Sequence, residues 1–202
     1  MKKYGGIELG DTFGGYEIVN VPTNKLPQDV ASAVSAVNSN PLLGATYNPI
    51  WYWGNQPVNG MNHFFIAEDI RATKNKDNSI VGLIINVPAG EGSIKGEGAK
   101  IVRIIDGEAL PPEIQTAFAT VEKELDGMSY KPVVYIGKQT TRGENHYIVC
   151  ESRVIYSGVQ TPKAVIFVVN IFEGKPTLAG LLPINSTEKE DQQKLFGYAF
   201  TW

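Results

Sequence analysis

The stretch GNQPVNGMNH, residues 54–63, returns 83 residues later as GKQTTRGENH, residues 137–146. The likeness continues upstream, because GATYNP at 44–49 precedes the first stretch and GMSYKP at 127–132 precedes the second. The two histidines of the chain, His63 and His146, coincide in this alignment. A repeat of this length corresponds to a small domain rather than to a solenoid unit, so two related folding units are expected.

Each copy contains one segment whose apolar residues recur at helical spacing, which predicts one amphipathic helix per copy. The stripes are Val30, Ala33, Val34 and Val37 in the first copy and Ile114, Ala117, Phe118 and Val121 in the second. Pro27 and Pro111 stand near the first helical position, where no amide hydrogen is needed.

The remaining segments read as strands because they are rich in aromatic and β-branched residues. The expected strands are 47–53, 63–73 and 80–87 in the first copy and 133–136, 146–156 and 165–172 in the second. The predicted class is α+β, with two tandem units that each pack one helix on a curved antiparallel sheet. The units are expected at residues 1–100 and 101–184, with a C-terminal tail at 185–202. A long strand at 93–105, either shared between the units or bent, is expected where they meet.

Composition excludes several functional classes. The 202 residues carry a net charge of -3, which gives no basic patch for a nucleic acid or a membrane surface. No apolar run reaches the length of about 18 residues that a transmembrane helix needs. No signal peptide is recognised after Lys2 and Lys3, and the compartment stays open, with a secreted protein lacking its signal peptide as one reading.

The order helix, strand, Gln-x-Val-x-Gly turn and long strand resembles the cystatin family. Residues 56–60 fit that motif, and Gly14-Gly15 precedes the helix at a distance similar to that of the family's glycine. The likeness covers roughly residues 14–184 as two tandem cystatin-like repeats, which are also similar to repeats in bacterial proteins of unknown function. The second copy departs from the motif because Thr141 replaces the valine.

The resemblance implies a protein partner, with a papain-like cysteine protease as the leading candidate. Cystatins insert an N-terminal segment and two hairpins into the protease cleft as a wedge. In this chain, the resemblance assigns that contact to Gly15 and to the hairpin residues Gln56, Pro57, Val58, Asn59 and Gly60. Gln56 and Gly60 have a structural reading as well, since Gln56 can brace the turn and Gly60 can supply its left-handed conformation.

The alternative is a non-inhibitory recognition or structural module. Neither second hairpin carries the tryptophan that cystatins often place there, which favours this reading. Trp51 and Trp53 share one face of their strand and would form a protein-binding anchor if exposed. The aromatic residues of the tail at 185–202 are expected to dock on the body or to serve as a short binding motif.

No catalytic, metal or cofactor site is expected from the sequence. One histidine per copy, without a second histidine or a nearby cysteine, cannot make an ordinary zinc site. The lone Cys150 is four residues from His146 in one strand, a separation of about 13 Å and too far for a nucleophile and its base. We therefore expect Cys150 to be a small core residue and the protein to act without catalysis.

Overall fold

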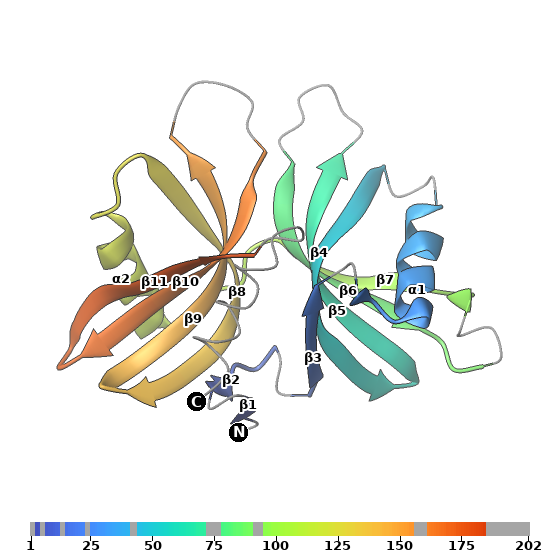
Figure 1. Cartoon of the computed structure of the whole chain (residues 1–202), viewed down its shortest axis with the longest axis horizontal. Coiled ribbons are helices and arrows are strands. Elements are labelled where there is room, and N and C mark those ends of the chain that lie inside the picture. The colour runs from blue at the N-terminus through green and yellow to red at the C-terminus, as the bar shows by residue number, and fades with distance from the viewer. Residues whose placement is uncertain are drawn as a thin grey trace. The chain divides into compact units, whose positions relative to one another are not determined.

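The computed structural model describes residues 3–4, 7–12, 15–22, 25–40, 44–71, 78–90, 95–155 and 161–184. Contacts divide the chain into two compact units (Figure 1). The first unit is Tyr16–Asp106, and the second unit combines Met1–Gly15 with Gly107–Trp202. The second unit is therefore discontinuous in sequence, whereas the sequence suggested consecutive units meeting at residue 100.

The first unit contains a five-stranded antiparallel sheet in chain order. Its strands are β3 (Glu17–Pro22), β4 (Ala45–Val58), β5 (Gly60–Arg71), β6 (Ser79–Val87) and β7 (Lys100–Ile105), and α1 (Gln28–Asn38) connects β3 to β4. β7 pairs with β6. The expected strand shared by both units is thus wrong for the described residues 100–105, which lie in the sheet of the first unit.

The second unit contains a six-stranded antiparallel sheet in the order β1-β2-β8-β9-β10-β11. Its strands are β1 (Lys3–Tyr4), β2 (Ile7–Leu9), β8 (Met128–Thr141), β9 (Gly143–Val154), β10 (Lys163–Phe172) and β11 (Lys175–Pro183). Its helix, α2 (Pro112–Glu122), precedes β8.

The N-terminal strand β2 fills, in the second sheet, the place that β3 holds in the first. Leu9 pairs with Gly137 in the second unit, and Ile18 pairs with Gly54, the equivalent position, in the first. The approach is close, because a Cβ added at Gly137 would lie 2.1 Å from the backbone oxygen of Glu8. Glycine at this position therefore makes room for the added strand.

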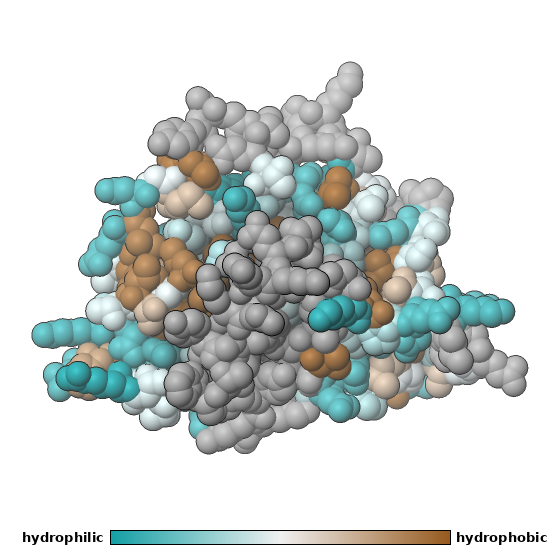
Figure 2. Space-filling model, viewed as in Figure 1, coloured by the Kyte–Doolittle hydropathy of each residue, from teal (hydrophilic) through white to brown (hydrophobic). Residues whose placement is uncertain are grey.

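The helical stripes are confirmed, and each packs on one face of its own sheet. Val30, Ala33 and Val37 of α1 are buried in a cluster with Tyr52 and Phe65. In the second unit, the equivalent cluster joins the stripe of α2 to Tyr130, Ile148, Cys150 and Phe167. Apolar side chains are visible at the surface where α2 lies beside β11 (Figure 2).

The expected α+β class is wrong, because the described chain is β-rich. Two antiparallel sheets dominate it, and each of the two helices has only 11 residues. The strands exceed their expected lengths, since β4 and β8 each run for 14 residues. Register shifts between Pro49 and Trp51 and between Tyr52 and Gly54 let β4 pass residues that usually end strands.

Within the described residues, neither helix is long and apolar enough to cross a membrane.

Candidate functional site

The hairpin between β4 and β5 turns at a single residue. Val58 pairs with Gly60, which leaves Asn59 alone at the tip. Pro57, Val58 and Asn59 are all exposed, and Val58 is 48% exposed. The expected turn at 56–60 is therefore present in a shorter form, with an apolar side chain presented to solvent.

Position 60 requires glycine for two reasons, close packing and a left-handed backbone conformation with φ of 102°. A Cβ added there would lie 2.1 Å from the backbone oxygen of Val87. Gly143 repeats this arrangement, with 2.4 Å to the backbone oxygen of Ile171. The end of β6 or β10 thus packs directly against the hairpin, which supports the structural reading of both glycines.

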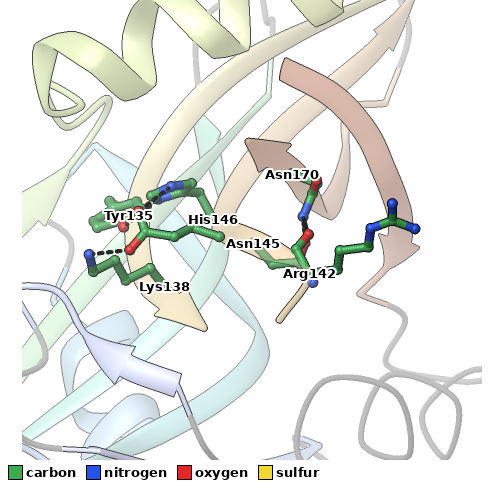
Figure 3. Close-up of polar contacts among 7 residues, drawn as sticks. Tyr135, Lys138, Arg142, Asn145, His146 and Asn170 are labelled. Carbon is green, nitrogen blue, oxygen red and sulfur yellow. Dashed lines mark hydrogen bonds and ion pairs between the residues drawn. The ribbon is translucent and has the colours of Figure 1, made fainter. Parts of the chain in front are cut away.

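Gln56 belongs to a row of amide side chains across three strands at the base of the hairpin. Asn62 Nδ2 donates to Gln56 Oε1 at 3.5 Å, and Asn86 Nδ2 donates to Asn62 Oδ1 at 2.9 Å. In the second unit, Asn170 Nδ2 donates to Asn145 Oδ1 at 2.7 Å (Figure 3). Gln139 Oε1 accepts from Tyr147 Oη instead. These bonds brace both hairpins from one side of the sheet.

The other predicted contact residues are not brought together into one exposed surface. Trp51 and Trp53 are 2% and 1% exposed, so neither offers an exposed anchor. Gly15 is exposed and lies two residues before Glu17, the first residue of β3, which pairs with Asn55 beside the hairpin base. The tail at 185–202 lies outside the described residues.

Each unit has a pocket between the start of its helix and the end of its sheet. The pocket of the first unit has a volume of about 560 Å³ and is lined by Asp29, Tyr52, Val58 and His63, among others. The pocket of the second unit has a volume of about 460 Å³ and is lined at equivalent positions by Glu113, Tyr135 and His146. Both volumes fall in the range of roughly 300–1,000 Å³ typical of ligand sites.

A hydrogen-bonded tyrosine–histidine pair lines each pocket. Tyr52 Oη is 3.0 Å from His63 Nδ1, and Tyr135 Oη is 3.0 Å from His146 Nδ1. Burial lowers the pKa of both histidines and raises that of Tyr52 to about 12. Both pairs are therefore neutral near pH 7.

The second pocket is more highly charged than the first. Lys138 Nζ lies 2.7 Å from Glu144 Oε1, and His146 lies beside this ion pair (Figure 3). The first unit has Asn55 and Met61 at the positions of Lys138 and Glu144. The hydrogen bond from Lys138 lowers the pKa of Glu144, so the carboxylate stays ionised.

Cys150 is a core residue, as expected. It is 0% exposed within the cluster beneath α2, and burial raises the pKa of its thiol well above the usual range. A thiol in that state is a poor nucleophile. Within the described ranges, no group of three or more His, Cys, Asp or Glu side chains is placed to hold a metal ion.

Neither the tyrosine of each pair nor the pockets were predicted from the sequence. A signal was present, because Tyr52 and Tyr135 are 83 residues apart, as are His63 and His146. Each tyrosine also precedes its histidine by 11 residues, with the hairpin between them. The register pairs Tyr52 with Phe65 and Tyr135 with Ile148, so each histidine is the diagonal neighbour of its tyrosine on the adjacent strand.

Comparison with protein-family models and with curated proteins finds no match to this sequence.

Proposed function

We propose that the protein is a non-catalytic binding protein and that the β4–β5 hairpin of the first unit contacts a protein partner. The observation that carries this proposal is the exposed apolar tip, where Val58 is 48% exposed between Pro57 and Asn59. The packing of Gly60 and the amide row at Gln56 hold the tip in place before any partner binds. A preformed tip loses little conformational freedom on binding.

A papain-like cysteine protease is the partner that we propose for this hairpin. The Gln-x-Val-x-Gly pattern at 56–60 resembles the contact hairpin of cystatins, and here it occupies a tight turn with the valine outward. The second unit presents Thr140, Thr141 and Arg142 instead, with the Arg142 guanidinium 5.0 Å from the centre of the Phe172 ring. We therefore assign inhibition to the first unit.

The test is titration of papain with the purified protein, with residual peptide hydrolysis as the readout. Val58→Asp should weaken inhibition by about tenfold or more, because it places a charge at the centre of an apolar contact. Thr141→Asp is the matched control at the equivalent tip and should inhibit as the unmodified protein does. Gly60 is unsuited to this test, because any side chain there would collide with the backbone at Val87.

Inhibition that survives Val58→Asp would contradict the assignment to this hairpin. Absence of inhibition at micromolar protein would overturn the protease as the partner and leave recognition of another protein by the same tip. In that case, Val58→Asp and Thr141→Asp remain the matched pair for testing any partner that is found.

A further inference from the structure

The pocket of the first unit has mainly apolar walls. They come from β3, from α1, from the β4–β5 hairpin and from the segment after β6, and include Val19, Val30, Val58, Met61, Pro88 and Ala89. The polar side chains that line it are Asp29, Tyr52, Asn55 and His63, and no lysine or arginine is among its described lining residues. With about 560 Å³, the pocket suits a small molecule with an apolar body and few polar atoms.

The histidines of the two pockets differ in how far Nε2 is closed off. Each ring hydrogen-bonds through Nδ1 to its tyrosine, and no described group hydrogen-bonds to Nε2 of either ring. Nε2 of His146 is fully buried, whereas Nε2 of His63 is not, although His63 as a whole is only 5% exposed. His63 lines its pocket, so an occupant can reach this nitrogen. A largely buried polar atom without a partner needs an explanation, and a ligand supplies one.

The neighbours of the two rings account for the difference. In the second unit, Glu144 Oε2 lies 3.8 Å from Nε2 of His146, and Glu144 is held there by Lys138 (Figure 3). The equivalent positions of the first unit carry Met61 and Asn55, which cannot form an ion pair. No charged pair therefore lies over His63.

The hydrogen bonds around Tyr52 assign the ring proton of His63 to Nε2. Burial is the main cause that raises the pKa of Tyr52 to about 12, so the hydroxyl keeps its proton near pH 7. A hydrogen bond from the Asn55 side chain lowers that pKa, as a bond donated to the phenol oxygen does. The hydroxyl proton is then directed at Nδ1, 3.0 Å away. A neutral imidazole that accepts at Nδ1 carries its proton on Nε2, so Nε2 is a donor.

The start of α1 adds a positive potential at the same pocket. Pro27, Asp29 and Val30 line the pocket, so the first turn of the helix faces it. Hydrogen bonding in the helix begins with the Ala31 amide and the Pro27 carbonyl at 3.0 Å, and no side chain caps this end. The amides before Ala31 therefore have no acceptor within the helix. An acceptor oxygen is favoured here, whereas a carboxylate would meet the like charge of Asp29.

We propose that the pocket of the first unit binds a neutral molecule that carries a carbonyl group on an apolar body. The carbonyl oxygen accepts from Nε2 of His63 at the positive end of α1, and the body lies against the apolar walls. The carbonyl can belong to a free ketone or to an amide of an apolar peptide residue, since both present the same acceptor. This inference does not depend on the proposed role of the β4–β5 hairpin.

The experiment is a nuclear magnetic resonance titration of the full chain at pH 7.5 with acetophenone, read at the imidazole of His63. Ethylbenzene keeps the apolar body but lacks the acceptor, and benzoate adds a negative charge. A saturable shift is expected with acetophenone, with affinity about fivefold or more weaker for the other two, because a hydrogen bond is lost or a like charge is added. Nα-acetyl-leucine methylamide is the peptide arm, and tighter binding than acetophenone would identify a peptide carbonyl as the source.

Two double variants exchange the side chains that distinguish the pockets. Asn55→Lys/Met61→Glu places the charged pair of the second unit beside His63 and should abolish the response. Lys138→Asn/Glu144→Met is the matched control and should leave the His63 response unchanged. The remaining amide resonances show whether each variant is folded.

Four results would overturn the proposal. They are no response of His63 to acetophenone, equal affinity for ethylbenzene or benzoate, and an undiminished response in a folded Asn55→Lys/Met61→Glu variant. The fourth needs no ligand: imidazole nitrogen shifts of the free protein that place the His63 proton on Nδ1 would remove the donor.

Discussion

At the scale of single residues, the buried histidines make the stability of the fold depend on pH. His63 and His146 each contact a tyrosine hydroxyl at 3.0 Å, and burial is the main cause that lowers the pKa of each imidazole. For His146, burial outweighs the attraction of Glu144. Unfolded histidine titrates near pH 6.5, roughly its usual value, so the unfolded chain takes up these protons first. The stabilisation is therefore complete above that pH and is lost as the pH falls through the lowered folded pKa.

We expect the free energy of unfolding to fall between pH 7.5 and pH 5.0, with part of the loss due to these two residues. The double variant His63→Gln/His146→Gln should lose less over the same interval, because glutamine does not titrate. Urea unfolding at both pH values measures the two differences. Equal losses in the two proteins would show that other groups carry the pH dependence.

Substitution of Gly60 should cost more stability than substitution of a glycine that is needed only for its left-handed backbone conformation. Gly44 is the control, because it has φ of 62° but no atom within 4 Å of an added Cβ. Gly44→Ala should cost about 1–2 kcal/mol for the left-handed conformation. Gly60→Ala adds a collision with the Val87 carbonyl and should cost about 3 kcal/mol or more. Urea unfolding of the two variants tests this, and equal costs would show that the backbone relaxes around Gly60.

At the scale of elements, the sequence predicted the helices well and the strands less well. The apolar stripes at Val30 and Ile114 have a period that only a helix produces, and both helices lie where expected. Strand ends were harder to predict, because Pro49 and Gly54 resemble breaks while the register shifts of β4 carry the strand past them. The burial of Trp51 and Trp53 could not be predicted from the sequence of β4 alone, because it depends on which other residues cover that face of the strand.

β2 was missed because a strand of three residues has no measurable periodicity. A weaker signal was available in the sequence. GGIEL at 5–9 resembles GGYEI at 14–18, and the Glu-Leu and Glu-Ile pairs of these segments occupy equivalent places in the two sheets. The same sequence pattern thus marks the strand that pairs with β4 in the first unit and the strand that pairs with β8 in the second.

Removal of residues 1–11 should destabilise the edge of the second sheet and leave the first sheet unaffected. The deletion takes away the pairing of β2 with Gly137 and Lys138, and with it the hydrogen bond from the Gly10 amide to the Ile136 carbonyl at 2.8 Å. Hydrogen–deuterium exchange should become at least about tenfold faster at residues 136–138. Exchange at 53–55, the equivalent positions of β4, is the control, and equal acceleration at both places would contradict the assignment of β2.

At the scale of the whole molecule, the division into units predicts where the chain can be opened. A circular permutant that begins at Tyr16 and carries residues 1–15 after a linker at the C-terminus makes both units continuous. Its free energy of unfolding should stay within about 1 kcal/mol of the original, because no strand is cut. A permutant opened between Lys100 and Ile101 interrupts β7 and should be clearly less stable. Urea unfolding compares them, and the reverse order would support a boundary at residue 100.

The placement of β2 also has a consequence for the order in which a ribosome makes this chain. All of Tyr16–Asp106 has been synthesised before the second unit has received its helix. Glu8, by contrast, cannot pair with Lys138 until that residue has been synthesised, 130 residues later. At a rate of about 5–20 residues per second, the N-terminal strand spends on the order of ten seconds without its neighbour while the chain grows. A strand that is synthesised early is therefore expected to be among the last parts of this chain to take its native place.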